Sequence, residues 1–138
     1  MGKRSREKGA AAERYAARIL QILYPDAQRR VSGEEGQGEK LGRDLKGTPG
    51  LCVQVKEHSA PRPLEEMLEE VLAAREQGEI AAVFVRKARR GTSCPFRVVV
   101  TLRDFLRLMA AYRGMPPGAE RAHLEALMAD EQMKARIG

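Results

Sequence analysis

The spacing of hydrophobic residues along the chain changes between a helical period and a strand-like period. Residues 5–23 carry apolar side chains at helical spacing, whereas residues 51–57 (LCVQVKE) and 80–88 (IAAVFVRKA) are short apolar runs rich in valine. Residues 63–78 form the clearest amphipathic helix, with acids in the first turns and a glycine at the end. The run at 80–88 has no polar interruption until its end, which predicts a central strand covered on both faces.

The predicted order of elements is helix, strand, strand, strand, helix, strand, strand and helix, followed by a C-terminal helix. The strand around residue 44 and the strand at 51–57 are expected to form a hairpin. The helix that begins near residue 63 is expected to cross over to the next strand. This order predicts an α/β fold, with a mixed central β-sheet flanked by helices.

A break with the sequence GMPPG predicts where the main domain ends. It separates a core domain of residues 1–114 from a C-terminal helical appendage of residues 115–138. The helix expected from Ala119 to Ile137 has four acidic and three basic residues, so its net charge is −1. The positive charge of the chain therefore belongs to the core domain.

The first helix is predicted to begin with Ser5 as its cap and to end near Leu23, before Tyr24 and Pro25. Glu13 lies at the margin of its apolar stripe, so a carboxylate is expected beside the core and not in bulk water. The stripe consists of Ala12, Tyr15, Ala16, Ile19, Leu20 and Leu23.

Composition restricts the class of protein. A chain of 138 residues with 43% hydrophobic residues can form one compact core. Its net charge of +6 and pI near 9.7 favour a polyanionic partner, with nucleic acid as the leading candidate. No run approaches the roughly 20 apolar residues that cross a bilayer, so we expect a cytoplasmic protein without membrane contact. Cys52 and Cys94 are expected to be reduced, packed thiols.

The strand at 51–57 contains two polar side chains where a buried strand should be apolar. Because side chains alternate along a strand, Gln54 and Lys56 point to the same side, together with Cys52 and His58. If the chain around Asp44 pairs with this strand as a hairpin, the Asp44 carboxylate lies beside Gln54. The oxygen atoms of Asp44 and Gln54 and the ammonium group of Lys56 would then lie close together.

Such a group of side chains is suited to one kind of chemistry. Hard divalent cations prefer oxygen ligands, and Mg²⁺ typically takes one or two carboxylates together with water and phosphate oxygens. A lysine beside the metal can position the attacking water and offset the charge of the phosphate. The pattern therefore predicts metal-assisted hydrolysis of a phosphodiester.

Asp44, nine intervening residues and then Gln54, Val55 and Lys56 resemble the D-xₙ-(D/E)-x-K signature of the PD-(D/E)XK nucleases. With the helical Glu13 and a glycine-rich loop upstream, the chain is most similar to the archaeal-type Holliday junction resolvases, including phage members. The resemblance implies a restriction-endonuclease-like core. It also implies that Asp44, Gln54 and the main-chain carbonyl of Val55 ligate the metal, that Lys56 handles the nucleophilic water, and that Glu13 reaches the metal directly or through water.

The chain departs from the family pattern at three places. Arg43 replaces the proline that usually precedes the aspartate. Gln54 replaces the expected acid, which keeps a carbonyl oxygen but removes a negative charge, so Glu13 should matter more. The loop at 33–42 is longer and more acidic than expected, and Ser32 matches the family serine only loosely. This loop is a candidate to become ordered on DNA.

Individual residues also have purely structural explanations. Asp44 could cap backbone amides in a turn, Lys56 could extend from a strand end into water, and Glu13 could pair with a neighbouring arginine. His58 and His123 are expected at the surface. A basic surface could simply be solvated, but several of its members can flank one site, which favours contact with DNA phosphates. The expected DNA-binding residues are Lys3, Arg4, Arg6, Lys8, Arg29, Arg30, Ser32, Arg43, Arg89 and Arg90, and Arg86, Lys87 and Arg97 extend the basic surface.

The sequence thus predicts a Mg²⁺-dependent, structure-selective DNA endonuclease, in which Mn²⁺ substitutes for Mg²⁺. We expect a homodimer that resolves four-way junctions, because paired cuts on opposing strands require two symmetry-related sites. Two alternatives remain. One is another PD-(D/E)XK nuclease that cuts flaps, ends or duplex, and the other is a DNA-binding module without catalytic activity.

Overall fold

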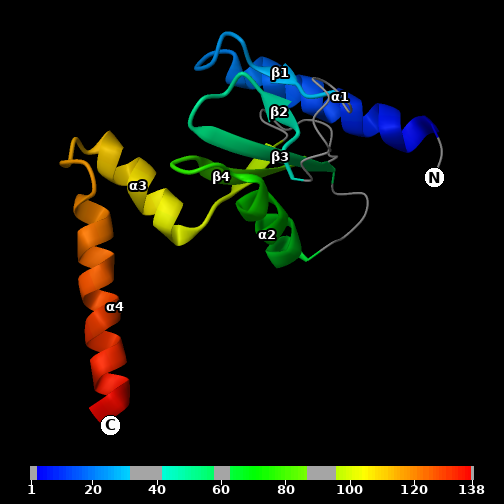
Figure 1. Ribbon diagram of the computed structural model, residues 1–138. Coiled ribbons are helices and arrows are strands. Elements are labelled where there is room, and N and C mark those ends of the chain that lie inside the picture. Colours follow the sequence, from blue (N-terminus) through cyan, green and yellow to red (C-terminus); the bar gives the residue numbers. More distant parts are fainter. Residues whose placement is uncertain (1–2, 32–41, 58–62, 87–95, 138) are drawn as a thin grey trace. The chain divides into compact units, whose positions relative to one another are not determined.

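The computed structural model of the chain describes residues 3–31, 42–57, 63–86 and 96–137. The chain divides into two compact units, Met1–Val100 and Thr101–Gly138. The helices and strands are, in chain order, α1 (Lys3–Leu20), β1 (Gln28–Arg29), β2 (Leu45–Lys46), β3 (Leu51–Glu57), α2 (Leu64–Ala74), β4 (Ile80–Arg86), β5 (Phe96–Val99), α3 (Leu102–Tyr112) and α4 (Ala119–Ile137) (Figure 1).

The order of these elements is the one that the hydrophobic pattern predicts, and the fold is mixed α/β. Strands β3, β4 and β5 form a mixed sheet in that spatial order, with β3 and β4 parallel and β4 and β5 antiparallel. Strands β1 and β2 form a separate antiparallel ladder in which each strand has two residues. The predicted single central sheet is therefore divided into two.

The crossover between β3 and β4 is made by α2, as predicted. The parallel register runs from Leu51 opposite Ile80 to Glu57 opposite Arg86. Parallel neighbours cannot be joined by a tight turn, so a helix carries the chain back to the start of the next strand. Strand β3 is left at one edge of the three-stranded sheet.

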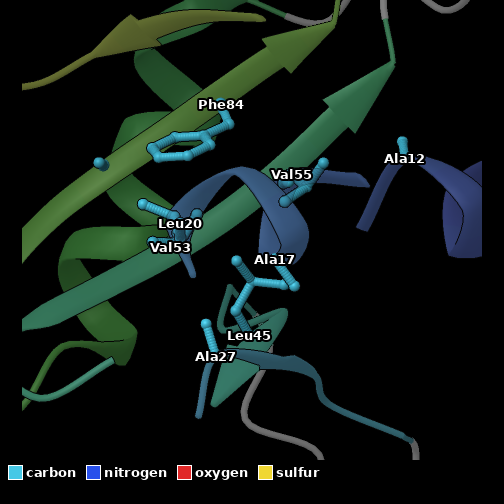
Figure 2. Close-up of a cluster of buried hydrophobic side chains, with 10 residues drawn as sticks. Ala12, Ala17, Leu20, Ala27, Leu45, Val53, Val55 and Phe84 are labelled. Atoms are coloured by element: carbon cyan, nitrogen blue, oxygen red, sulfur yellow. The ribbon is translucent and has the colours of Figure 1, made fainter. Parts of the chain in front are cut away.

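Helices α1 and α2 cover opposite faces of β3 and β4 (Figure 1). On the α1 side, Ala12, Ala17 and Leu20 pack over Val53 and Val55 (Figure 2). On the other side, the buried cluster consists of Cys52, Met67, Val71, Ala81 and Val83. The alternation predicted for β3 is thus present, because Val53 and Val55 face α1 whereas Cys52 faces α2.

The predicted bounds of the first helix were wrong at both ends. Helix α1 begins at Lys3, so Ser5 lies inside the helix and does not cap it. It ends at Leu20, where the main chain tightens into a turn, with Leu23 N donating to Leu20 O at 2.9 Å. Leu23 is therefore 71% exposed instead of lying in the buried stripe. Small side chains carry the packing of this helix, since Ala12, Ala16 and Ala17 are buried.

A close approach of main-chain segments fixes the turn after β2. Gly47 has a φ of +75°, and a Cβ atom at this position would lie 2.2 Å from the carbonyl oxygen of Asp26. Only glycine fits such a contact without a shift of the backbone. The chain that carries Asp44 and β2 is thereby held against the segment before β1.

In the second unit, α3 and α4 pack against each other. Thr101 caps α3, because its Oγ1 atom accepts a hydrogen bond from the main-chain nitrogen of Asp104 at 3.0 Å. This unit begins at Thr101, so it groups α3 with α4, whereas the sequence pattern places the domain boundary at residue 114.

Among the described residues, no helix has the length and apolar character needed to cross a membrane.

Candidate functional site

Asp44 is bound to the edge of β3 that lies opposite β4. Its main-chain nitrogen donates to Val53 O at 2.9 Å, and its Oδ2 atom accepts a hydrogen bond from Val55 N at 2.7 Å. Its carbonyl oxygen also accepts from the main-chain nitrogen of Arg30 at 2.8 Å. The contacts to Val53 and Val55 place Asp44 beside Gln54. The predicted hairpin is wrong, however, because β2 pairs with β1 and belongs to a different sheet from β3.

Gly42 brings the segment that carries Asp44 against helix α2. Its φ is +97°, and a Cβ atom at this position would lie 2.5 Å from the carbonyl oxygen of Glu70. The two main chains therefore approach more closely than any side chain would permit. This contact places Asp44, two residues further along the chain, next to the same turn of α2.

Gln54 is 2% exposed, and its two amide atoms differ in their partners. Its Nε2 atom donates a hydrogen bond to Oε2 of Glu70 at 2.8 Å. Its Oε1 atom is buried and has no hydrogen-bond partner among the residues that the structure describes. A buried acceptor without a partner is costly, so such atoms often mark a site for a water molecule or an ion.

Lys56 lies on the same side of β3 and meets the same carboxylate. Its Nζ atom is 4.0 Å from Oε2 of Glu70, and both side chains are about one-third exposed. The predicted shared face of Gln54 and Lys56 is therefore present, and Glu70 is the group that joins them. The lysine keeps access to solvent, whereas the glutamine is enclosed.

Glu13 approaches from α1 and forms an ion pair. Its Oε2 atom is 2.7 Å from Nε of Arg29. The pKa of Glu13 is raised from its usual value, first by burial of the carboxyl and then by the negative charge of Asp44. The hydrogen bond and charge of Arg29, together with the charge of Lys56, act in the opposite direction.

The pKa of Asp44 is also raised, mainly because burial disfavours its charged form. The hydrogen bond from Val55 and the charge of Lys56 lower this pKa, while the negative charge of Glu70 raises it further. Three acids, Glu13, Asp44 and Glu70, thus act on one neighbourhood together with Lys56. Crowded carboxylates with raised pKa values are typical of sites that bind cations or perform proton transfer.

Glu70 was missed by sequence reasoning. It was counted only among the acids of a helix, although the pattern held a signal for its position. Glu70 lies three residues after Met67 and directly before Val71, both of which are buried, so it belongs to the inward side of α2. The same argument placed Glu13 at the margin of a core-facing stripe.

The oxygen donors of the site are of the kind that hard divalent cations prefer. No three side chains of His, Cys, Asp or Glu in the described ranges are grouped so that they could hold a metal ion by themselves. A cation here would therefore need the buried Oε1 atom of Gln54 in addition to the carboxylate of Asp44. An amide oxygen and a carboxylate, completed by water and phosphate oxygens, form a set that Mg²⁺ accepts. The role predicted for the carbonyl of Val55 stays a prediction.

The other polar members of the predicted face contribute less. The Sγ atom of Cys52 lies 3.9 Å from the carbonyl oxygen of Val71, and burial raises the pKa of its thiol. Cys52 is thus a packed, free thiol, as predicted. His58 and Cys94 lie outside the described residues.

Two of the expected DNA-binding arginines are paired with acids. Arg29 binds Glu13, and Arg43 binds Glu79. The side chain of Arg30 is half-buried. Of the remaining members of this set, Lys3, Arg4, Arg6 and Lys8 belong to α1, and Ser32, Arg89 and Arg90 lie outside the described residues.

Comparison of the chain with models of protein families, with curated proteins and with solved structures gave no match. A function for the chain therefore has to be inferred from the residues and geometry of the site.

Proposed function

We propose that this protein is a divalent-metal-dependent DNA endonuclease of the PD-(D/E)XK type, and that its preferred substrate is a four-way DNA junction. One observation carries the proposal. Asp44 and Gln54 are adjacent at the edge of β3, and the buried Oε1 atom of Gln54 lacks a partner among the described residues, while the charges of Lys56 and Glu13 act on the same place. Asp44, Gln54 and Lys56 occupy the positions of the signature motif, and Glu13 is the upstream helical carboxylate.

Each residue has a distinct task in this mechanism. When bound, Mg²⁺ would stabilise charge on the phosphate and make a water molecule more acidic. Asp44 is oriented for binding because the main-chain nitrogen of Val55 holds its Oδ2 atom. The solvent-accessible ammonium of Lys56 can orient the attacking water and offset negative charge on the phosphate. The water oxygen forms a bond to phosphorus while the bond from phosphorus to the 3′ oxygen breaks, and one proton of the water ends on the 3′ oxygen, so the products are a 5′-phosphate and a 3′-hydroxyl. Glu13, held by Arg29, adds a further carboxylate that can order water at the site.

The basic character of the chain and the geometry of a junction support the choice of substrate. A net charge of +6 favours a nucleic acid over a small phosphate ester. Four-way junctions are two-fold symmetric, and a homodimer would direct two sites to opposing strands. The two cuts would then be symmetric.

The test is cleavage of an end-labelled four-way junction by the full chain in Mg²⁺, beside a linear duplex of the same sequence. We expect the wild-type protein to cut the junction and to prefer it over the duplex. Asp44→Asn should bind the junction without cutting it, because it retains the hydrogen bond from Val55 but loses the charge. Asp130→Asn, an exposed change on α4, serves as the matched control and should cut like the wild type.

Equal cleavage of junction and duplex would favour another nuclease of the same type. Gln54 favours the second alternative, a DNA-binding module without catalysis, because it replaces a metal-binding carboxylate by a neutral amide. That alternative predicts junction binding without cleavage in either Mg²⁺ or Mn²⁺, and no difference between Asp44→Asn and the wild type.

A further inference from the structure

We infer that Glu70 of α2 supplies the carboxylate that position 54 lacks, so that Gln54 and Glu70 together take the place of one acidic metal ligand. This inference rests on the proposed function, because it concerns the same site. In this arrangement Gln54 contributes its buried oxygen, and Glu70 contributes the negative charge from the neighbouring helix.

The hydrogen bond between the two side chains determines how the amide is oriented. Glu70 Oε2 is an acceptor, so the atom of Gln54 that lies 2.8 Å from it must be the donor Nε2. The opposite orientation would place two acceptors against each other. The Oε1 atom is therefore the end of the amide that does not contact Glu70.

The Oε1 atom needs a partner that the described residues do not provide. The Gln54 side chain is buried, and this atom accepts no hydrogen bond among the described residues. A divalent cation that takes Oε1 as a ligand would satisfy it. The carboxylate of Glu70, fixed on the other end of the same amide, would supply charge that a neutral amide cannot.

The main chain keeps Glu70 close to Asp44. Gly42 packs directly against the carbonyl oxygen of Glu70, and only one residue, Arg43, separates it from Asp44. Lys56 Nζ lies 4.0 Å from Glu70 Oε2, so the predicted lysine is also directed to this carboxylate. Glu70 is thus the residue of α2 that lies beside the edge of the sheet. Its neighbour Glu69 is exposed.

The test measures Mn²⁺ binding by calorimetry on the full chain without DNA. Glu70→Gln should weaken Mn²⁺ binding at least about tenfold, the loss typical when a supporting group of a metal site is removed. The matched control is Glu69→Gln, the same change on an exposed residue of the same helix, and it should bind like the wild type. The exchange variant Gln54→Glu with Glu70→Gln keeps one amide and one carboxylate in contact, so it should bind Mn²⁺ within about threefold of the wild type.

Rescue by the exchange variant separates a role in metal binding from a purely structural one. If Glu70 only holds Gln54 and Lys56 in place, Glu70→Gln lowers the melting temperature but binds Mn²⁺ like Glu69→Gln, and the inference is wrong. If Glu70→Gln loses binding and the exchange variant does not regain it, the inference is also wrong. Junction cleavage by the wild type reports separately on the proposed function, which stands if cleavage depends on Asp44 while Mn²⁺ binding is independent of Glu70.

Discussion

Gln54 Nε2 donates a hydrogen bond to Glu70 Oε2 across 2.8 Å, and this contact joins strand β3 to helix α2 at the candidate site. It explains why a buried strand carries a polar side chain. The amide is held at one end by a helix carboxylate, and its other end has no partner among the described residues. Together with Asp44 and Lys56, the pair forms a group of charged and polar atoms at the edge of the sheet.

Asp44→Asn should raise the stability of the folded protein at neutral pH. The pKa of Asp44 is raised in the folded state, so folding favours the protonated carboxyl. The cost of ionising it is absent below the unfolded value of 3.8, and it appears as the pH rises through the higher folded pKa. Asparagine cannot ionise and keeps an oxygen to accept the hydrogen bond from Val55.

The measurement is thermal unfolding of the wild type and Asp44→Asn without divalent cations, at pH 7.5 and near pH 4. We expect the variant to melt at a higher temperature at pH 7.5 and the difference to shrink towards acid pH. A variant that is less stable at pH 7.5 would show that the Asp44 carboxylate stabilises the fold. Its assignment to a binding site would then lose support.

Gly42→Ala should destabilise the protein more than Gly50→Ala does. Both glycines have a positive φ, but a Cβ atom at residue 50 meets nothing within 4 Å, whereas at residue 42 it meets the carbonyl oxygen of Glu70. Positive φ alone costs an alanine about 1–2 kcal/mol. The steric contact should add roughly 1–3 kcal/mol at residue 42.

Urea unfolding of the two glycine variants gives these free energies directly. Gly42→Ala should also weaken Mn²⁺ binding, because it moves the segment of Asp44 away from Glu70. Equal free energies of unfolding for the two variants would contradict the close approach of residue 42 to α2.

Lys56→Met should lower the rate of junction cleavage while Mn²⁺ binding remains. The lysine is assigned to the water and the phosphate, and groups with such roles typically contribute about 10²–10⁴-fold to the rate. Methionine retains much of the aliphatic length of the side chain. The cleavage rate is measured under single-turnover conditions and Mn²⁺ binding by calorimetry, for Lys56→Met and for the wild type. An unchanged cleavage rate would show that Lys56 has no role in the mechanism.

Arg30→Gln should reduce the salt dependence of junction binding by about one unit of log–log slope, as expected for the loss of one phosphate contact. Arg29→Gln should change the slope less, because Arg29 is already engaged by Glu13. Binding of the two variants is measured by fluorescence anisotropy over a series of salt concentrations. A larger effect at Arg29 than at Arg30 would show that the ion pair opens for DNA.

The order of helices and strands could be predicted from the sequence because each long element carries its own periodic pattern. The alternation along β3 is also predictable, because the strand period alone places Gln54 and Lys56 on one face. The division of the sheet into two ladders could not be predicted. Strands β1 and β2 have two residues each, and such short strands leave no periodic signal.

Two features of the site depend on contacts between distant segments, and a linear pattern does not contain them. The pairing of Glu13 with Arg29 depends on how β1 packs against α1. The position of Glu70 depends on how the crossover helix is rotated over β3, which Met67, Val71 and the approach of Gly42 determine. The helical pattern indicates that Glu70 lies on the inward side of α2. It does not indicate that Gln54 is the residue it contacts.

The most direct test of the account is an anomalous diffraction measurement on crystals of the wild-type protein soaked in Mn²⁺. The account predicts an anomalous peak within about 2.5 Å of Gln54 Oε1 and of a carboxylate oxygen of Asp44, a distance expected for oxygen ligands. Crystals of Asp44→Asn treated in the same way should lack the peak. Wild-type crystals with bound Mn²⁺ only elsewhere, and with Gln54 Oε1 bonded to another group, would contradict the proposed site.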